Sequence, residues 1–228
     1  MLHGLNADAT GYVEPIEDWP DPAAELTQTP GLRPAAAARA ERAALLDWRR
    51  SLPRREVEAR SDSVATWARE ATFPVRNAAA YAAMRGEIDP SPTLTALGVR
   101  RVAYPRMVGN ALEFRCPANA TAMKKHRLGM TEPLPTDPPF ELAEADVIFV
   151  PLALFDRRCH RIGYGGGFYD RTLAALVTHG PTSPGLSSGR RPRFIGLAHD
   201  EQCVDEWEPE AWDIGMDAVW TPTQTFTR

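Results

Sequence analysis

The segment Arg161–Arg171 holds the residue types best suited to chemistry on a phosphate group. Four glycines fall within five of its positions: Gly163, Gly165, Gly166 and Gly167. Without Cβ atoms, the backbone there can adopt positive φ, approach a ligand closely and turn successive N–H groups toward an anion. A helix expected to start near Phe168 would add free N–H donors and the positive end of its dipole. The segment therefore predicts a polyphosphate cradle flanked by two arginines.

Two better-known phosphate loops do not match this segment. A P-loop, GxxxxGK[ST], requires a lysine that the segment lacks, and the dinucleotide fingerprint GxGxxG would need a glycine where Phe168 stands. A tight turn from strand to helix, with no ligand, is an alternative that the glycines alone leave open. The flanking arginines, the aromatic residues and Asp170 favour the phosphate site.

Composition limits the class of protein. The chain has 228 residues, 43% of them hydrophobic, and a net charge of -4, which allows a sizeable core and argues against general binding of nucleic acid. Of its 26 basic residues only Lys124 and Lys125 are lysines, so a phosphate clamp must be built mostly from arginine and backbone N–H. The three cysteines lack metal-ligand spacing, and we see neither a signal peptide nor an apolar run long enough to span a membrane. We expect a cytoplasmic monomer or homodimer with no membrane or nucleic-acid partner.

The elements that must position this segment alternate between helix and strand. Residues 1–33 carry six acidic side chains, one arginine and four prolines, which predicts an irregular extension before a single domain at 34–228. Helices are expected at 34–50, 53–71, 92–97 (with Ser91 as N-cap) and 168–179, loops at 131–140 and 181–193, and strands at 78–84, 99–104, 112–116, 146–150, 194–198 and 216–220. The continuous apolar run at 146–150 is typical of a strand buried on both faces of a sheet. The pattern predicts an α/β fold, a single three-layer domain with a central, largely parallel sheet flanked by helices.

Together with the preceding Val147–Asp156, the segment Arg161–Arg171 resembles the signature of the 5-formyltetrahydrofolate cyclo-ligase family. Shorter blocks similar to those of the family follow in the same order: Gly86–Asp89, Tyr104–Arg106, Glu132–Pro133, Ile195–Ala198, Gln202 and Asp213–Thr221. The resemblance covers about residues 36–221. It implies an ATP- and Mg²⁺-dependent enzyme that cyclises the reduced folate 5-formyltetrahydrofolate to 5,10-methenyltetrahydrofolate and releases ADP and phosphate.

The resemblance also implies roles for individual residues. ATP would be bound by the first helix and the glycine segment: Arg39, Arg42, Arg161, Ile162, Gly163, Tyr164, Gly165, Gly166, Gly167, Phe168 and Tyr169. The reduced folate would be bound by Ala82, Glu87, Tyr164, Gly165, Gly166, Gly167 and Phe168. Asp170 and Asp217 would hold Mg²⁺, which usually takes one or two protein carboxylates. Arg161 and Tyr164 are the expected catalytic residues, because phosphoryl transfer needs positioning and charge stabilisation more than a nucleophile.

Some of these residues could instead have a purely structural role. The same holds for Arg106 and for two histidines outside the list. Arg106 could be a surface ion-pair partner, Glu87 a solvated carboxylate on a turn, and Asp170 a favourable charge at a helix N-terminus. The aromatic side chains are expected to divide between ligand stacking and core packing: Tyr164, Phe168 and Tyr169. His160 and His199 are expected to be structural, since the mechanism needs neither.

Two positions depart from the family pattern. A lysine that members often carry in the first helix is matched by Ala38, and a lysine that some carry in the glycine segment is matched by Gly166. Arg39, next to Ala38, could replace the first charge. Two alternatives stay open: a non-catalytic or altered-substrate relative that binds folate or nucleotide, and an α/β sugar-phosphate or acyl-group enzyme that uses the segment as a plain phosphate site.

Overall fold

The computed structural model describes residues 32–118, 122–126, 129–178 and 191–228. Nearly all of the predicted extension at 1–33 and of the predicted loop at 181–193 lies outside the described residues. Residues 32–228 form one compact unit. The predicted domain boundary between residues 33 and 34 stays a prediction.

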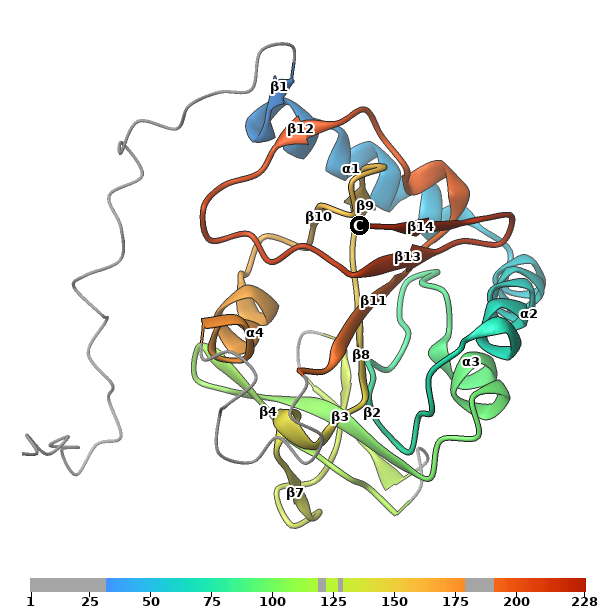
Figure 1. The fold of residues 1–228 in the computed structure, drawn as a ribbon, viewed down its shortest axis with the longest axis vertical. Coiled ribbons are helices and arrows are strands. Elements are labelled where there is room, and N and C mark those ends of the chain that lie inside the picture. The colour runs from blue at the N-terminus through green and yellow to red at the C-terminus, as the bar shows by residue number, and fades with distance from the viewer. Residues whose placement is uncertain (1–31, 119–121, 127–128, 179–190) are drawn as a thin grey trace, which may run out of the picture. The chain divides into compact units, whose positions relative to one another are not determined.

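An eight-stranded sheet forms the centre of this unit (Figure 1). The strand order is β14-β13-β11-β8-β2-β3-β4-β7, in which β13, β11, β8, β2 and β3 run parallel and the outer strands pair antiparallel. The strands in chain order are β2 (Asn77–Ala79), β3 (Arg101–Val108), β4 (Ala111–Arg115), β7 (Pro139–Phe140), β8 (Val147–Val150), β11 (Arg193–Leu197), β13 (Ala218–Trp220) and β14 (Thr225–Thr227). The predicted central, largely parallel sheet is confirmed.

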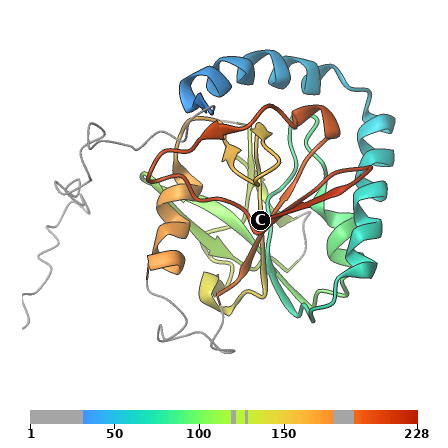
Figure 2. The ribbon, with the colours of Figure 1, turned by 45° about the horizontal axis from the view of Figure 1, so that its top comes forward.

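Helices and smaller ladders surround the sheet (Figure 2). The helices are α1 (Ala35–Ser51), α2 (Arg54–Glu70), α3 (Pro90–Ala96) and α4 (Phe168–Thr178), with short 3₁₀ turns at Leu142–Glu144 and Asp200–Gln202. The ladders pair β1 (Arg33–Pro34) with β12 (Trp207–Glu208), β5 (Lys124–Lys125) with β6 (Thr131–Glu132), and β9 (Leu154–Phe155) with β10 (Arg161–Ile162).

Side chains along the central strands alternate between two hydrophobic layers. In β8, Val147 and Phe149 join the cluster that contains residues of α2 and α3, whereas Ile148 and Val150 join the cluster that contains Leu173 of α4. All of β8 is buried, as predicted for a strand covered on both faces. The helices therefore cover both faces of the sheet, and the predicted three-layer arrangement is confirmed.

Some local predictions were wrong. The third helix begins at Pro90, and its N-cap is Asp89, whose carboxylate accepts from the Ser91 N–H; the aspartate takes the role assigned to the serine. Strand β2 ends at Ala79 rather than residue 84: residues 80–84 are irregular, and the chain turns at Arg85–Gly86, where the Met84 N–H donates to the Glu87 carboxylate.

The chain does not pass directly from β8 to the glycine segment. The hairpin β9–β10 intervenes, and its turn is held by Asp156, whose Oδ1 accepts from the backbone N–H of Arg158 and of His160, each at 2.9 Å. A third cluster of buried residues packs α1 on this hairpin: Ala35, Ala38, Leu154, Ile162 and Trp207. The hairpin therefore places the glycine segment next to α1.

Candidate active site

The glycine loop, residues 163–167, connects β10 to α4. Gly165 and Gly167 adopt φ of +96° and +61°, values that side chains with a Cβ rarely adopt. A Cβ at Gly165 would lie 3.1 Å from Arg42 Nη1, and one at Gly167 would lie 2.7 Å from Arg171 Nη1. Within the described residues, no amide of this loop donates a backbone hydrogen bond. Free N–H groups and two guanidinium groups therefore lie close together at an exposed stretch of backbone.

Arg161 anchors the loop from its N-terminal side. Its side chain is buried, and Nη2 lies 2.6 Å from Asp170 Oδ1 in the first turn of α4. The same Asp170 oxygen accepts the Ile214 N–H at 3.3 Å. Burial, and next the charge of Asp170, raise the pKa of Asp213, while the Glu210 N–H, which donates to Asp213 Oδ2 at 3.0 Å, and then Arg39 and Arg161 oppose the rise. Two carboxylates, Asp170 and Asp213, thus share one electrostatic environment.

The first helix, α1, has alanine at the position matched to the family lysine, and Arg39 stands next to it. Ala38 is fully buried in the cluster that contains Ile162, so this position faces the hairpin β9–β10. Arg39 Nη1 lies 3.3 Å from Glu210 Oε1, and Nη2 lies 4.0 Å from Asp213 Oδ2. Ile162, predicted to contact ATP, buries its side chain and offers a ligand only backbone atoms.

Two aromatic residues at the start of α4, Phe168 and Tyr169, have different surroundings. The Arg171 guanidinium lies 5.2 Å from the centroid of the Phe168 ring, whereas Tyr169 packs edge-on against Phe114 in the core. The Tyr169 hydroxyl and Arg161 Nε are buried and have no hydrogen-bond partner among the described residues. Burial raises the pKa of Tyr169, so its hydroxyl remains a donor. Such unpartnered buried donors suit a ligand oxygen or a bound water.

A second part of the site is built around Glu87. The Tyr164 hydroxyl donates to Glu87 Oε1, and Arg49 Nη2 of α1 donates to the Tyr164 hydroxyl oxygen. Glu87 Oε2 accepts the Met84 N–H at 2.9 Å. Glu87 is 5% exposed, and burial raises its pKa despite the opposing charge of Arg49. The structure thus brings Tyr164 and Glu87 together, with Ala82 half-buried in the chain between β2 and this carboxylate.

Histidines hold backbone turns around the site. Arg85 and Gly86 have φ of 53° and 77°, and a Cβ on Gly86 would overlap the Arg49 carbonyl oxygen. His199 Nε2 lies 2.8 Å from the Gly86 oxygen, and burial lowers the pKa of His199, so the ring is neutral and donates to that carbonyl. His160 Nδ1 lies 3.0 Å from Asp156 Oδ2 in the β9–β10 turn. Both contacts agree with structural roles.

Asp217 and Arg106 have partners elsewhere. Asp217 accepts from Arg191 at 2.8 and 2.6 Å and from the Phe194 N–H at 2.7 Å. Arg106 forms an ion pair with Glu113 at 2.9 Å, in keeping with its structural interpretation. No group of three or more metal-ligating side chains occurs among the described residues.

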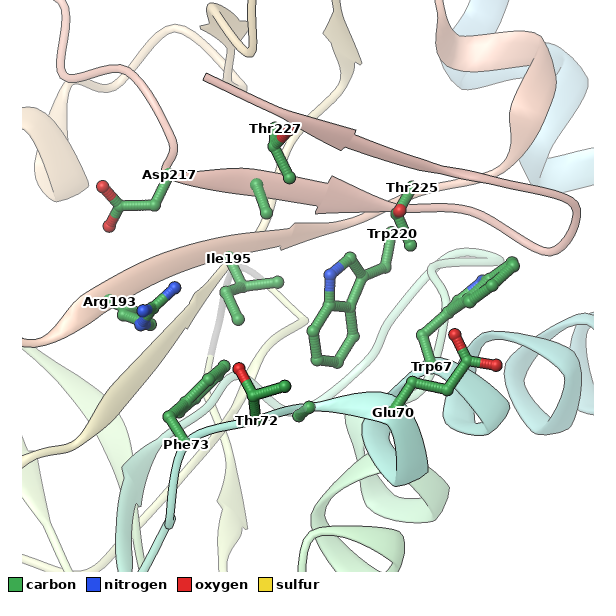
Figure 3. A pocket seen from close by; sticks show the side chains of 12 residues that line it. Trp67, Glu70, Thr72, Phe73, Arg193, Ile195, Asp217, Trp220, Thr225 and Thr227 are labelled. Carbon is green, nitrogen blue, oxygen red and sulfur yellow. The ribbon is translucent and has the colours of Figure 1, made fainter.

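Asp217 lines a separate cleft of about 230 Å³ between the end of α2 and strands β11, β13 and β14 (Figure 3). Two of the groups that line it already have partners. The Arg193 guanidinium lies 4.4 Å from the Phe73 ring centroid, and Trp67 Nε1 donates to the Thr221 carbonyl at 2.8 Å. The chemistry described above is located at the glycine loop, outside this cleft.

Comparison with known proteins identifies the family. Residues 34–222 match the family model of the 5-formyltetrahydrofolate cyclo-ligase family. The chain belongs to this family. The 5-formyltetrahydrofolate cyclo-ligase of Escherichia coli (strain K12) is 33% identical over 190 residues, covering 78% of this chain and 96% of that protein. The protein of the same name from Mycolicibacterium smegmatis is 32% identical over 190 residues, covering 79% and 91%.

Solved structures support the fold. An NMR structure of Aquifex aeolicus 5,10-methenyltetrahydrofolate synthetase aligns with a TM-score of 0.64 at 22% identity, covering 83% of this chain and 92% of that one. The family, the fold class and the cyclo-ligase enzyme class predicted from the sequence are confirmed. In the described part of the cyclo-ligase chain, no helix is both long and apolar enough to cross a membrane.

Sequence reasoning missed Arg49 and Asp213. Arg49 follows Arg42 by seven residues, a spacing that places both on one face of a helix. Asp213 lies in the matched block Asp213–Thr221, four residues before Asp217, so the choice between the two aspartates needed the structure.

Proposed function

We propose that this chain catalyses the ATP-driven cyclisation of 5-formyltetrahydrofolate to 5,10-methenyltetrahydrofolate. The formyl oxygen attacks the γ-phosphorus and ADP leaves. N10 then attacks the activated formyl carbon, and the oxygen departs with phosphate. Each step transfers one group between bound reactants, so the protein must align them and stabilise charge rather than supply a nucleophile.

The single observation that carries this proposal is the junction at Tyr164. Its backbone belongs to the glycine loop, whose free amides and neighbouring arginines suit a triphosphate, while its hydroxyl donates to Glu87. In the proposal, Glu87 would accept N–H donors of the pterin. One loop therefore touches both proposed substrate sites, as transfer from ATP to a formyl oxygen requires.

Arg161 supports the phosphate end of the site. Asp170 fixes its guanidinium through Nη2, while Nε is a buried donor without a partner among the described residues. Arg171 donates to the Gly166 carbonyl at 2.8 Å, which holds a second cation against the loop. These groups would stabilise the charge that develops on the transferring phosphoryl group.

Mg²⁺ fits the residues present. Asp170 and Asp213 supply two carboxylates near Arg161, and the raised pKa of Asp213 comes from burial and then from Asp170, a repulsion that a cation would relieve. Magnesium commonly binds through one or two carboxylates and completes its shell with phosphate and water. It would offset phosphate charge there. Asp217 stays a prediction as a ligand; like Asp170, it already accepts from an arginine and a backbone N–H, but its arginine is Arg191, outside the glycine loop.

The test is an absorbance assay for methenyltetrahydrofolate with purified protein, 5-formyltetrahydrofolate, ATP and Mg²⁺. Turnover should require all three additions and should yield one ADP and one phosphate per ring closed. Absence of product at high enzyme concentration would overturn the proposal. Function in a reducing cytoplasm, as a monomer or homodimer without nucleic acid or membrane, belongs to the same proposal.

The buried Ala38 favours one second candidate, a relative that binds reduced folate or nucleotide without catalysis. Because Ala38 cannot present a charge to phosphate, the site loses one cation that the family often has. Tight binding of 5-formyltetrahydrofolate with no turnover would select this candidate. Turnover supported by Arg39 or Arg42 would reject it.

A further inference from the structure

Arg49 is almost completely buried at the end of α1, with 1% of its surface exposed. Its Nε donates to the Arg85 carbonyl and its Nη1 to the Leu152 carbonyl, each at 3.2 Å. Its Nη2 donates to the Tyr164 hydroxyl. One guanidinium therefore joins the turn before Glu87, the chain after β8 and the glycine loop. The planar fork of arginine can span these three directions, which the single ammonium of lysine cannot do equally well.

The same guanidinium compensates a buried carboxylate. Arg49 Nη2 lies 3.7 Å from Glu87 Oε1, the oxygen that also accepts the Tyr164 hydroxyl. Burial raises the pKa of Glu87, whereas Arg49, the Tyr164 hydroxyl and the Met84 N–H lower it. Without the cation, a carboxylate in this environment would more readily take up a proton and lose its capacity to accept two donors.

Other groups face Glu87 from the elements around it. The titratable and charged residues that interact with it are Arg49, Arg85, Tyr81, Tyr164 and Tyr169. Burial raises the pKa of each of the three tyrosines, so they remain neutral while Glu87 titrates. The arginines supply the positive charge, and Arg49 exerts the larger effect of the two on Glu87.

We propose that Arg49 is a positioning residue of the folate site, which keeps the Glu87 carboxylate ionised and holds the Tyr164 hydroxyl against it. This inference rests on the proposed function, in which Glu87 receives the pterin. Arg49 does not contact the reacting atoms. It links the glycine loop to the carboxylate that recognises the folate. Loss of Arg49 therefore weakens folate binding more than it weakens ATP binding.

The experiment compares Arg49→Met with the wild type and with Arg50→Met, a matched control because Arg50 is the next residue of α1 and is exposed beside Asp47. We expect the KM for 5-formyltetrahydrofolate to rise about 30- to 100-fold in Arg49→Met, as for the loss of one partner of a buried charge pair. The KM for ATP should change less than about threefold, within the range of a surface charge. Arg50→Met should leave both constants unchanged.

A pH profile separates positioning from a merely structural role. Because Arg49 lowers the pKa of Glu87, its removal should move the acidic limb of kcat/KM for the folate to higher pH. Arg49→Lys, which retains the charge but not the fork, should restore the position of that limb and only part of the affinity. An unchanged limb in folded Arg49→Met, or equal losses for both substrates, would overturn the proposal.

Tyr164→Phe keeps the proposal testable if Arg49→Met does not fold. It removes the bridging hydroxyl from a side chain that is 40% exposed, so the fold should survive. The effects of Tyr164→Phe and Arg49→Lys on folate binding, measured by tryptophan fluorescence with 5-formyltetrahydrofolate, should be non-additive. Additive effects would contradict the bridge. Wild-type protein that neither binds nor converts the folate would instead overturn the proposed function, and the role of Arg49 with it.

Discussion

The proposed site has two halves: a folate half around Arg49 and Glu87, and a phosphate half at the glycine loop. They differ in whether their polar groups find partners within the protein. In the folate half, Arg49 and Glu87 are 1% and 5% exposed and reach each other through the Tyr164 hydroxyl. In the phosphate half, Gly165 and Gly166 are exposed, and the loop amides have no backbone acceptor among the described residues. A buried charge must be paired inside the protein, whereas exposed donors can await a partner that the ligand brings. Under the proposed function, the part assigned to folate is therefore assembled by folding, and the part assigned to phosphate would be completed by ATP.

This comparison predicts different consequences for the two halves. Changes in the folate half should alter folate affinity and its pH dependence, because the bridge sets the ionisation of Glu87. Changes in the phosphate half should alter turnover, ATP affinity and the Mg²⁺ requirement while the fold persists. The following variants test the phosphate half from the largest expected effect to the smallest.

Gly167→Val should abolish turnover. Its φ of +61° disfavours any Cβ, a Cβ would lie 2.7 Å from Arg171 Nη1, and the branched side chain would occupy space in front of the loop amides. We expect kcat/KM for ATP to fall by more than about 10³-fold, as when preorganised donors to a transition state are lost. Cyclisation kinetics and a thermal melt measure the two effects.

Gly98→Val is the matched control for backbone strain. Its φ is +65°, and nothing lies within 4 Å of an added Cβ. It should therefore lower stability through strain alone and leave the kinetics intact. Equal losses of activity in the two variants would show that strain, rather than the phosphate site, explains the effect at Gly167.

Arg161→Gln should have the next largest effect. A well-placed arginine is worth about 10³-fold or more in phosphoryl transfer, so kcat should fall by about that factor. Arg101→Gln provides the control, because Arg101 and Glu144 form an ion pair with a similar contact of 2.7 Å outside the glycine loop. The pair of variants is compared in the cyclisation assay. A similar small loss in both would remove Arg161 from the mechanism.

Asp213→Asn should raise the Mg²⁺ concentration needed for half-maximal rate by about tenfold, as for the loss of a group that tunes a metal site. Asp217→Asn should leave this Mg²⁺ concentration unchanged if the metal binds at Asp170 and Asp213, beside Arg161. Burial and Asp170 raise the pKa of Asp213, so protons should compete with Mg²⁺ more strongly as pH falls, and the Mg²⁺ requirement should rise. A Mg²⁺ titration in which only Asp217→Asn is defective would restore the ligand inferred from the sequence.

The sequence predicted the fold well because its signals are local and periodic. The apolar run at Val147–Val150 predicted a strand covered on both faces, and the glycines predicted the loop before α4. Short elements were missed: β9–β10 consists of two-residue strands, and its turn depends on the Asp156 side chain. No periodicity can develop over two residues, so such a hairpin has no pattern to detect.

The proposed site combines residues that the sequence suggested with residues that only the structure brought in. The sequence supplied Arg161, Tyr164 and Glu87, since each stands in a recognisable block. The bridge through Arg49 could not be predicted, because it depends on the end of α1 meeting a turn 36 residues later in the chain. The Asp213–Asp170 interaction likewise joins segments far apart in sequence. The spacing of residues along the chain does not show which distant segments come into contact in the fold.

Arg42→Gln should have the smallest effect. Arg42 lies beside Gly165, is half-buried and forms no ion pair within the described residues, so its guanidinium would act on a bound phosphate as a partly solvated charge. Such charges contribute about 0.2–1 kcal/mol, which predicts a rise in the KM for ATP of less than about sixfold. Added salt should shrink this difference because it screens an exposed charge, whereas the Arg49→Met effect on folate should persist in salt. ATP and folate kinetics at low and high ionic strength measure both, and a salt-resistant effect at Arg42 would place it with the buried half instead.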